Sequence, residues 1–133
     1  MKPETLNTHS KGFLRSRKLI ELLFVSGKGV TSFPFRIQYY LLPSVDELKM
    51  EVLFTVPKKM FKKAVKRNVI RRRAKEAFRL NKHLFCGQIP ENYKLLLAFI
   101  YIDKTVHPYD IIRKSVIAGL EKIIKISINE NRP

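Results

Sequence analysis

The spacing of apolar residues near the start of the chain predicts a short helix. In the segment SRKLIELLFV, from Ser16 to Val25, the apolar side chains recur three or four positions apart and form one broad face. They are Leu19, Ile20, Leu23 and Phe24. Ser16 is a suitable N-cap, because its hydroxyl can accept a hydrogen bond from a backbone N–H of the first turn. Gly27 is suited to a left-handed cap at the other end.

Beyond this helix the period of the pattern changes to two, which is typical of strands. Apolar residues alternate with Arg36, Gln38 and Tyr40 in the next segment. The alternating series is Phe33, Phe35, Ile37, Tyr39 and Leu41. The segment PSVDEL, 43–48, is expected to turn the chain, and MEVLFTV, 50–56, predicts a second strand. We expect these two strands to pair as an antiparallel hairpin.

A third strand and a last helix complete the pattern. The run LLLAFIYI, from Leu95 to Ile102, is apolar enough to predict a strand in the middle of a sheet. The last helix is expected to open at Thr105 to His107, with Pro108 near its first position and Asp103 and His107 as capping residues. Its core stripe consists of Ile112, Val116, Leu120 and Ile123. This order of elements predicts helices packed on a sheet in an α/β sandwich, with part of the sheet uncovered or half covered.

Between the second and third strands lies a basic helix. The run from Lys58 to Lys82 contains twelve Lys and Arg but a single acid, Glu76. Placed at about 100° per residue, its apolar residues Ile70, Ala74, Ala77 and Phe78 form a narrow buried stripe. Asn68, Arg71, Arg72, Lys75, Arg79 and Lys82 fall on a roughly opposite face. Such a face can be an ordinary solvated surface, but a stripe of one sign repels itself and favours a phosphate backbone as its partner.

Composition supports a polyanionic partner. The chain has 133 residues, a formal net charge of +16 and a sequence pI near 10.2, which is more charge than solubility requires. We expect one domain at 13–128, a flexible leader at 1–12 and a tail at 129–133. The single cysteine, Cys86, excludes an intramolecular disulfide and fits the cytoplasm. The sequence predicts neither an export signal nor a membrane span.

The segment RNVIRRRAKEAFR, from Arg67 to Arg79, resembles the signature of the bacterial ribonuclease P protein component. In that signature Arg-Asn is followed by two basic residues, a spacer of two, and then a basic residue and an acid. The matching positions are Arg67, Asn68, Arg71, Arg72, Lys75 and Glu76. Leu14, Phe24 and Gly27 resemble the family's first helix and its end, and FTVPKK before AVKRN resembles the strand and basic turn before its signature helix.

The resemblance implies a fold and an activity. The fold is an α+β sandwich of order α-β-β-β-α-β-α, shared with a domain of a small-subunit ribosomal protein. It has a central four-stranded mixed sheet and an unusual left-handed βαβ crossover. In the family, an RNA subunit with Mg²⁺ at its active site cleaves precursor tRNA to free the mature 5′ end. The protein is the accessory subunit, which binds that RNA and the single-stranded 5′ leader of the substrate.

The family role assigns two sets of binding residues. For the RNA subunit we predict Arg67, Asn68, Arg71, Arg72, Lys75 and Arg79, because arginines bind phosphate in a bidentate way and Asn68 can bind a base edge or a 2′-hydroxyl. Glu76 is expected to be structural and to pair with Arg72 or Arg79. For the leader we predict Ile20, Phe24, Phe35, Arg36, Tyr39, Lys58 and Lys59, which combine stacking surfaces with charge. Phe24 fits either this cleft or the core.

Other functions are less consistent with the residues. His9, His83 and His107 lie in unrelated segments with few acids nearby, so neither protein catalytic residues nor a metal site is expected. The apolar face of the basic helix is too small for a membrane-surface helix, and DNA is not an expected partner. A basic ribosomal or other structural RNA-binding protein remains the alternative, because it would share the charge and the size.

Overall fold

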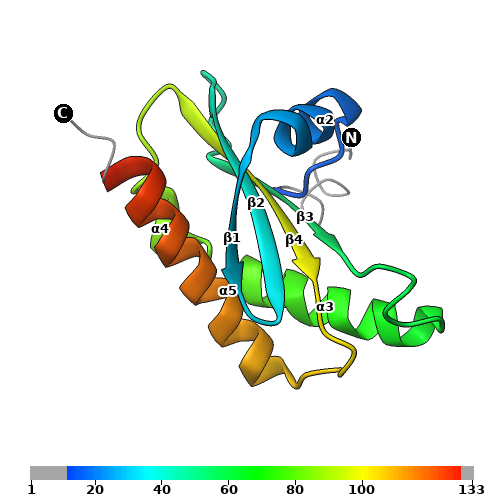
Figure 1. The fold of residues 1–133 in the computed structure, drawn as a ribbon. Helices are drawn as coiled ribbons and strands as arrows, with labels where there is room; N and C mark the ends of the chain where they lie inside the picture. Colours follow the sequence, from blue (N-terminus) through cyan, green and yellow to red (C-terminus); the bar gives the residue numbers. More distant parts are fainter. Residues whose placement is uncertain (1–11, 130–133) are drawn as a thin grey trace, which may run out of the picture.

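The computed structural model describes residues 12–129, so residues 1–11 of the predicted leader and 130–133 of the predicted tail lie outside the described residues. The three helices and three strands that the apolar pattern predicted are present, with bounds shifted by a few residues (Figure 1). The fourth strand, which the family order implied but the pattern did not locate, lies at 28–32. The helices are α2 (Arg17–Ser26), α3 (Ala64–Asn81), α4 (His83–Cys86) and α5 (Tyr109–Ile124), with a π-helical end η1 (Lys125–Asn129). The strands are β1 (Lys28–Ser32), β2 (Phe35–Pro43), β3 (Met50–Thr55) and β4 (Tyr93–Tyr101).

The four strands form one mixed sheet in the order β1-β2-β4-β3. β2 pairs antiparallel with both β1 and β4, and β3 pairs parallel with β4. The predicted antiparallel hairpin of β2 and β3 is therefore wrong. β4 lies between them because it is apolar on both faces, and residues 94–99 are all buried. The prediction that this strand is central is confirmed.

The connection from β3 through α3 to β4 is left-handed, as the family resemblance implied. In Figure 1, β3 and β4 both run downward, β4 lies to the left of β3, and α3 crosses behind the sheet. A parallel connection of this hand is uncommon, because strand twist favours the opposite one. The sheet and helices thus make the α+β sandwich that the resemblance implied.

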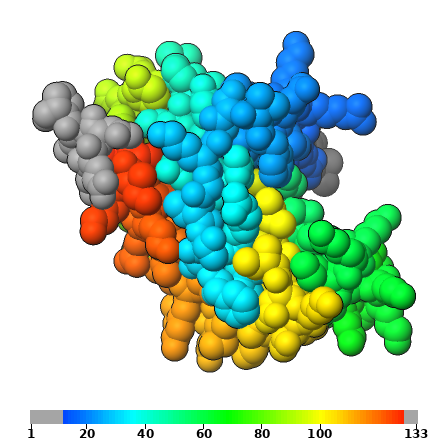
Figure 2. Space-filling model, in the orientation of Figure 1, coloured from blue at the N-terminus to red at the C-terminus, as the bar shows by residue number. Residues whose placement is uncertain are grey.

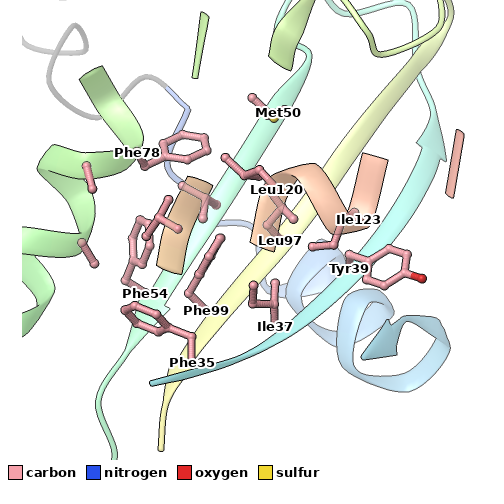
Figure 3. Close-up of a cluster of buried hydrophobic side chains, with 14 of the residues drawn as sticks. Phe35, Ile37, Tyr39, Met50, Phe54, Phe78, Leu97, Phe99, Leu120 and Ile123 are labelled. Atoms are coloured by element: carbon pink, nitrogen blue, oxygen red, sulfur yellow. The ribbon is translucent and has the colours of Figure 1, made fainter. Parts of the chain in front are cut away.

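The two faces of the sheet carry cores of different size. On one face α3 and α5 cover the main core, in which Phe35, Ile37, Phe54 and Phe99 are buried together (Figure 3). On the other face α2 covers a small cluster formed by Leu14, Leu23, Leu96 and Ala98. All four residues of the predicted stripe of α3 and all four of the stripe of α5 are buried. Both amphipathic predictions are confirmed.

Glycines allow two close approaches that position the helices. A Cβ at Gly119 on α5 would lie 2.3 Å from Cδ1 of Ile37, so the glycine lets α5 pack directly against β2. A Cβ at Gly27 would lie 2.3 Å from the carbonyl oxygen of Leu23 and 2.7 Å from that of Tyr39. Gly27 has φ −75° and ψ 168°, so the predicted left-handed cap is wrong. The glycine is needed because the chain passes close to two carbonyls. Ser16 is the N-cap, as predicted, and accepts from the N–H of Leu19.

Candidate nucleic-acid interface

Arg67, the first residue of the signature, holds the turn that leads into α3. Its guanidinium donates hydrogen bonds to the carbonyl oxygens of Phe61 at 2.7 Å and Lys62 at 3.0 Å. Lys63 is the N-cap of the helix and makes no side-chain capping hydrogen bond. Arg67 therefore fixes this end of α3 through side-chain contacts of its own. The predicted contact of Arg67 with RNA stays a prediction. The structure adds a second role, which is to hold the turn before α3.

Six polar residues of α3 lie together on the side opposite its buried stripe, and we call them the signature face. They are Asn68, Arg71, Arg72, Lys75, Glu76 and Arg79. The helix presents them because the core-facing positions of the same turns are taken by small or apolar residues. Lys82, which the helical period placed on this face, is the C-cap of α3. The structure thus brings together every predicted RNA-subunit residue except Arg67.

Contacts within the signature face orient two of its arginines. Nη2 of Arg71 donates to Oδ1 of Asn68. Arg79 donates to Glu76 through Nε at 3.1 Å and Nη2 at 2.8 Å, which is one of the two predicted pairings. This hydrogen bond lowers the pKa of Glu76 and raises that of Arg79, so both stay charged. Within residues 12–129, neither Arg72 nor Lys75 has a carboxylate at ion-pair distance. Their charges are available to an external anion.

Arg73 shows that the basic run is not uniform in role. Its guanidinium donates to the carbonyl oxygen of His107 at 2.7 Å and so ties α3 to the start of α5. The predicted capping of α5 by Asp103 and His107 is wrong. Nε2 of His107 lies 2.6 Å from Oδ2 of Asp103, and the N-cap is Pro108, whose side chain makes no capping hydrogen bond. The hydrogen bond with His107 lowers the pKa of Asp103.

A second surface lies on the α2 side of the sheet, and we call it the open sheet face. It consists of the α2-facing side chains of β2 and β4 at Arg36, Gln38, Tyr40 and Ile100. α2 covers only one end of the sheet (Figure 1). Side chains of the strands therefore reach the surface between α2 and α3 (Figure 2). Together with α2 this face offers aromatic, amide and cationic groups along one strand.

The predicted leader residues divide between the two faces of the sheet. Phe24 is 43% exposed on α2, which argues against a core position, and Ile20 is half-buried on the same helix. Phe35 and Tyr39 belong to the main core on the opposite face, where burial raises the pKa of Tyr39. The structure therefore contradicts their assignment to one cleft with Phe24. The reason is that side chains alternate along a strand. Phe35, Ile37 and Tyr39 face the main core, and Arg36, Gln38 and Tyr40 face α2.

The alternation of side chains along β2 also identifies residues on the side of α2 that the sequence reasoning missed. Tyr40 and Gln38 share the face of Arg36, and Tyr40 packs against the cluster beneath α2. Nε2 of Gln38 donates to the carbonyl oxygen of Gly27 at 3.1 Å, which ties the sheet to the end of α2. Lys58 and Lys59 are exposed in the turn after β3. They lie at the end of β3 that leads to α3, beyond the part of the sheet that α2 covers (Figure 1).

Neither a metal-binding cluster nor a membrane-spanning helix is found among the described residues. Across residues 12–129, no three His, Cys, Asp or Glu side chains are grouped so that they could hold a metal ion. No helix in the same range is long and apolar enough to cross a membrane. What the geometry provides is two polar surfaces on opposite sides of one sheet.

A comparison with protein-family models identifies the family. Residues 9–123 match the model described as Ribonuclease P. The chain belongs to the ribonuclease P protein family. It is 30% identical over 122 residues to the ribonuclease P protein component of Porphyromonas gingivalis (strain ATCC 33277), covering 91% of this chain and 89% of that protein.

Solved structures of ribonuclease P proteins share the fold. The Thermotoga maritima protein has a TM-score of 0.65 at 24% identity, covering 84% of this chain and 96% of that one. The Staphylococcus aureus protein has a TM-score of 0.59 at 19% identity, covering 86% and 96%. Family membership gives the chain the subunit role in tRNA processing and makes ribonuclease P RNA its partner. It also favours this role over the ribosomal or structural RNA-binding protein that charge alone allowed.

Proposed function

We propose that the chain is the accessory protein subunit of an endonuclease that removes the 5′ leader from precursor tRNA, and that it contacts two RNAs through two surfaces. The signature face of α3 binds the ribonuclease P RNA, and α2 with the open sheet face binds the single-stranded leader. The observation that carries the proposal is the signature face itself. Within residues 12–129, Arg72 and Lys75 of this face have no acidic partner, and Asn68 beside them has an amide that can reach a base edge or a 2′-hydroxyl.

The open sheet face supports leader binding through a different chemistry. Single strands bind where bases can stack on flat side chains and phosphates meet nearby cations. Phe24 and Tyr40 offer the flat groups, and Arg36 offers an exposed cation on the same side of the sheet. Lys58 and Lys59 extend the charge toward α3. Phe35 and Tyr39 are not part of this proposal, because they lie in the core.

The protein contributes affinity and not catalytic groups in this proposal. Its cations offset the repulsion between the catalytic RNA and the precursor tRNA, which are both polyanions. Mg²⁺ belongs to the RNA active site, where it supplies the chemistry of cleavage. The described residues do not fit a site for this ion, so no step is assigned to one bound by the protein. We place the complex in the cytoplasm.

Reconstitution with ribonuclease P RNA tests the proposed function. At low Mg²⁺, adding the chain should raise the rate of 5′ cleavage of precursor tRNA, because the protein then supplies positive charge that the scarce cation does not. Cleavage is scored on gels with and without the protein, and a lysine-rich peptide of equal net charge is the control. Equal stimulation by the peptide, or none by the protein, would contradict the proposal.

Replacing Phe24 with Ala should weaken binding of precursor tRNA to the reconstituted complex by about 1 to 3 kcal/mol, because a stacking surface for a leader base is lost. The effect should be confined to substrates that retain a leader. Affinities of the complex for precursor and mature tRNA are compared, with exposed Val25→Ala on the same helix as the matched control. An equal loss for mature tRNA would indicate a folding defect and contradict the leader contact.

A further inference from the structure

Phe13 lies outside every predicted site, but its backbone is held on both sides. The N–H of Val52 donates to the carbonyl oxygen of Gly12, and the N–H of Leu14 donates to that of Val52, each at 2.8 Å. Phe13 therefore forms an isolated parallel bridge with β3. Side chains alternate along such an extended segment. Leu14 enters the cluster beneath α2, and Phe13 packs against the main core beside α3.

The Phe13 ring is part of the wall of a shallow hollow over α3. The hollow has a volume of about 370 Å³, and all its other lining residues belong to the signature face. This volume lies within the range of about 300 to 1,000 Å³ that is usual for ligand sites. The ring is half-buried, its centroid lies 6.5 Å from that of Phe78, and Nζ of Lys75 lies 5.5 Å from its centroid. A fixed aromatic plane thus stands next to a row of cations.

We infer that this hollow binds an unstacked nucleobase of the ribonuclease P RNA, which stacks on Phe13 while its flanking phosphates meet Arg72 and Lys75. The inference deepens the proposed function and rests on it. Bases in loops and bulges are recognised in this way, by aromatic stacking next to phosphate contacts. Lys75 is exposed, so its ammonium can leave the ring for a phosphate when the base enters. The positive charge around the hollow favours a polyanion over an apolar or basic protein partner.

Replacing Phe13 with Leu tests the stacking contact, because Leu keeps an apolar side chain against Phe78 but has no ring. Affinity of this variant for ribonuclease P RNA should fall about 5- to 150-fold at fixed salt. The slope of log Kd against log salt should stay unchanged, since no phosphate contact is lost. Phe13→Tyr should retain wild-type affinity. Tyr93→Leu is the matched control, because it also removes an aromatic ring, from a residue at the start of β4 that is 38% exposed. This variant should bind the RNA normally.

A photoreactive phenylalanine analogue at position 13 locates the base directly and keeps an aromatic ring in place. On irradiation of the complex it should crosslink to one unpaired nucleotide of the RNA subunit. If the wild-type protein binds the RNA but Phe13→Leu binds equally well, or if crosslinks are absent or scattered over helical regions, the base site is overturned while the proposed function stands. If the wild-type protein does not bind the RNA, the proposed function itself fails.

Discussion

Replacing both Arg71 and Arg72 with Ala is expected to weaken binding of ribonuclease P RNA by about 100- to 10,000-fold at fixed salt. Each arginine loses a charge-assisted hydrogen bond to phosphate, which is worth about 1.5 to 3 kcal/mol, and tenfold in Kd corresponds to about 1.4 kcal/mol. The slope of log Kd against log salt should fall by about 1.4 to 1.8 units, because two phosphate contacts no longer release counterions. Titrations of the RNA at several salt concentrations measure both quantities.

A variant with the same loss of charge elsewhere separates a local contact from the field of the whole protein. Arg113 and Lys114 lie on α5 and belong to neither the signature face nor the open sheet face. Replacing both with Ala removes two positive charges, and the salt slope should stay close to that of the wild type. Equal slopes for the two double variants would assign the effect to net charge and contradict the role of α3.

Replacing Phe99 with Ala is expected to lower the free energy of unfolding by about 3 to 5 kcal/mol. Phe99 is fully buried at the centre of β4, and its ring centroid lies 5.5 Å from that of Phe35 and 5.1 Å from that of Phe54. Truncation removes these contacts and leaves a cavity that the neighbouring rings cannot fill. Since small domains have about 5 to 15 kcal/mol of stability in total, this is a large fraction. Urea denaturation followed by circular dichroism measures the change.

Phe33 supplies the matched control for this substitution. It is 59% exposed, and its ring contacts that of His107 edge-on at 5.8 Å. Phe33→Ala should lower the free energy of unfolding by about 1 kcal/mol or less. A loss at Phe33 as large as that at Phe99 would contradict the placement of the main core.

Local periodicity was sufficient to predict α2, α3 and α5 and the strands β2, β3 and β4, with most of their buried residues. The stripes of Ile70 on α3 and Ile112 on α5 are buried because one turn of a helix decides which residues share a face. Strand neighbours depend on segments far apart in the chain. Nothing between residues 33 and 56 shows that β4, about 40 residues later, enters between β2 and β3. The false hairpin follows from this. β1, which the family order implied, was not located by the pattern because it has too few apolar residues.

The site was predictable to the extent that it lies on one helix. Spacing along α3 predicted five residues of the signature face, and it wrongly added Lys82, which is the C-cap of the helix. It could not show that Arg67 and Arg73 would donate hydrogen bonds to carbonyl oxygens of the protein itself. On β2 the pattern gave the two alternating series but not which of them faces α2. Aromatic content then favoured Phe35 and Tyr39, although the larger helix layer covers that series. Tyr40 alternates with Tyr39 and faces α2, so the side of the strand, and not the aromatic character of the residue, decides whether the ring is accessible.

Because β4 is buried on both faces, it fixes the distance between the helices on the two sides of the sheet. Leu97 and Phe99 point into the core under α3 and α5, and Leu96 and Ala98 point under α2. One strand without exposed side chains at these positions therefore sets how far apart the two helix layers stand. If the catalytic RNA is bound on one side and the leader on the other, the position of the leader relative to the cleavage centre depends on the stiffness of this strand as much as on any residue that touches RNA.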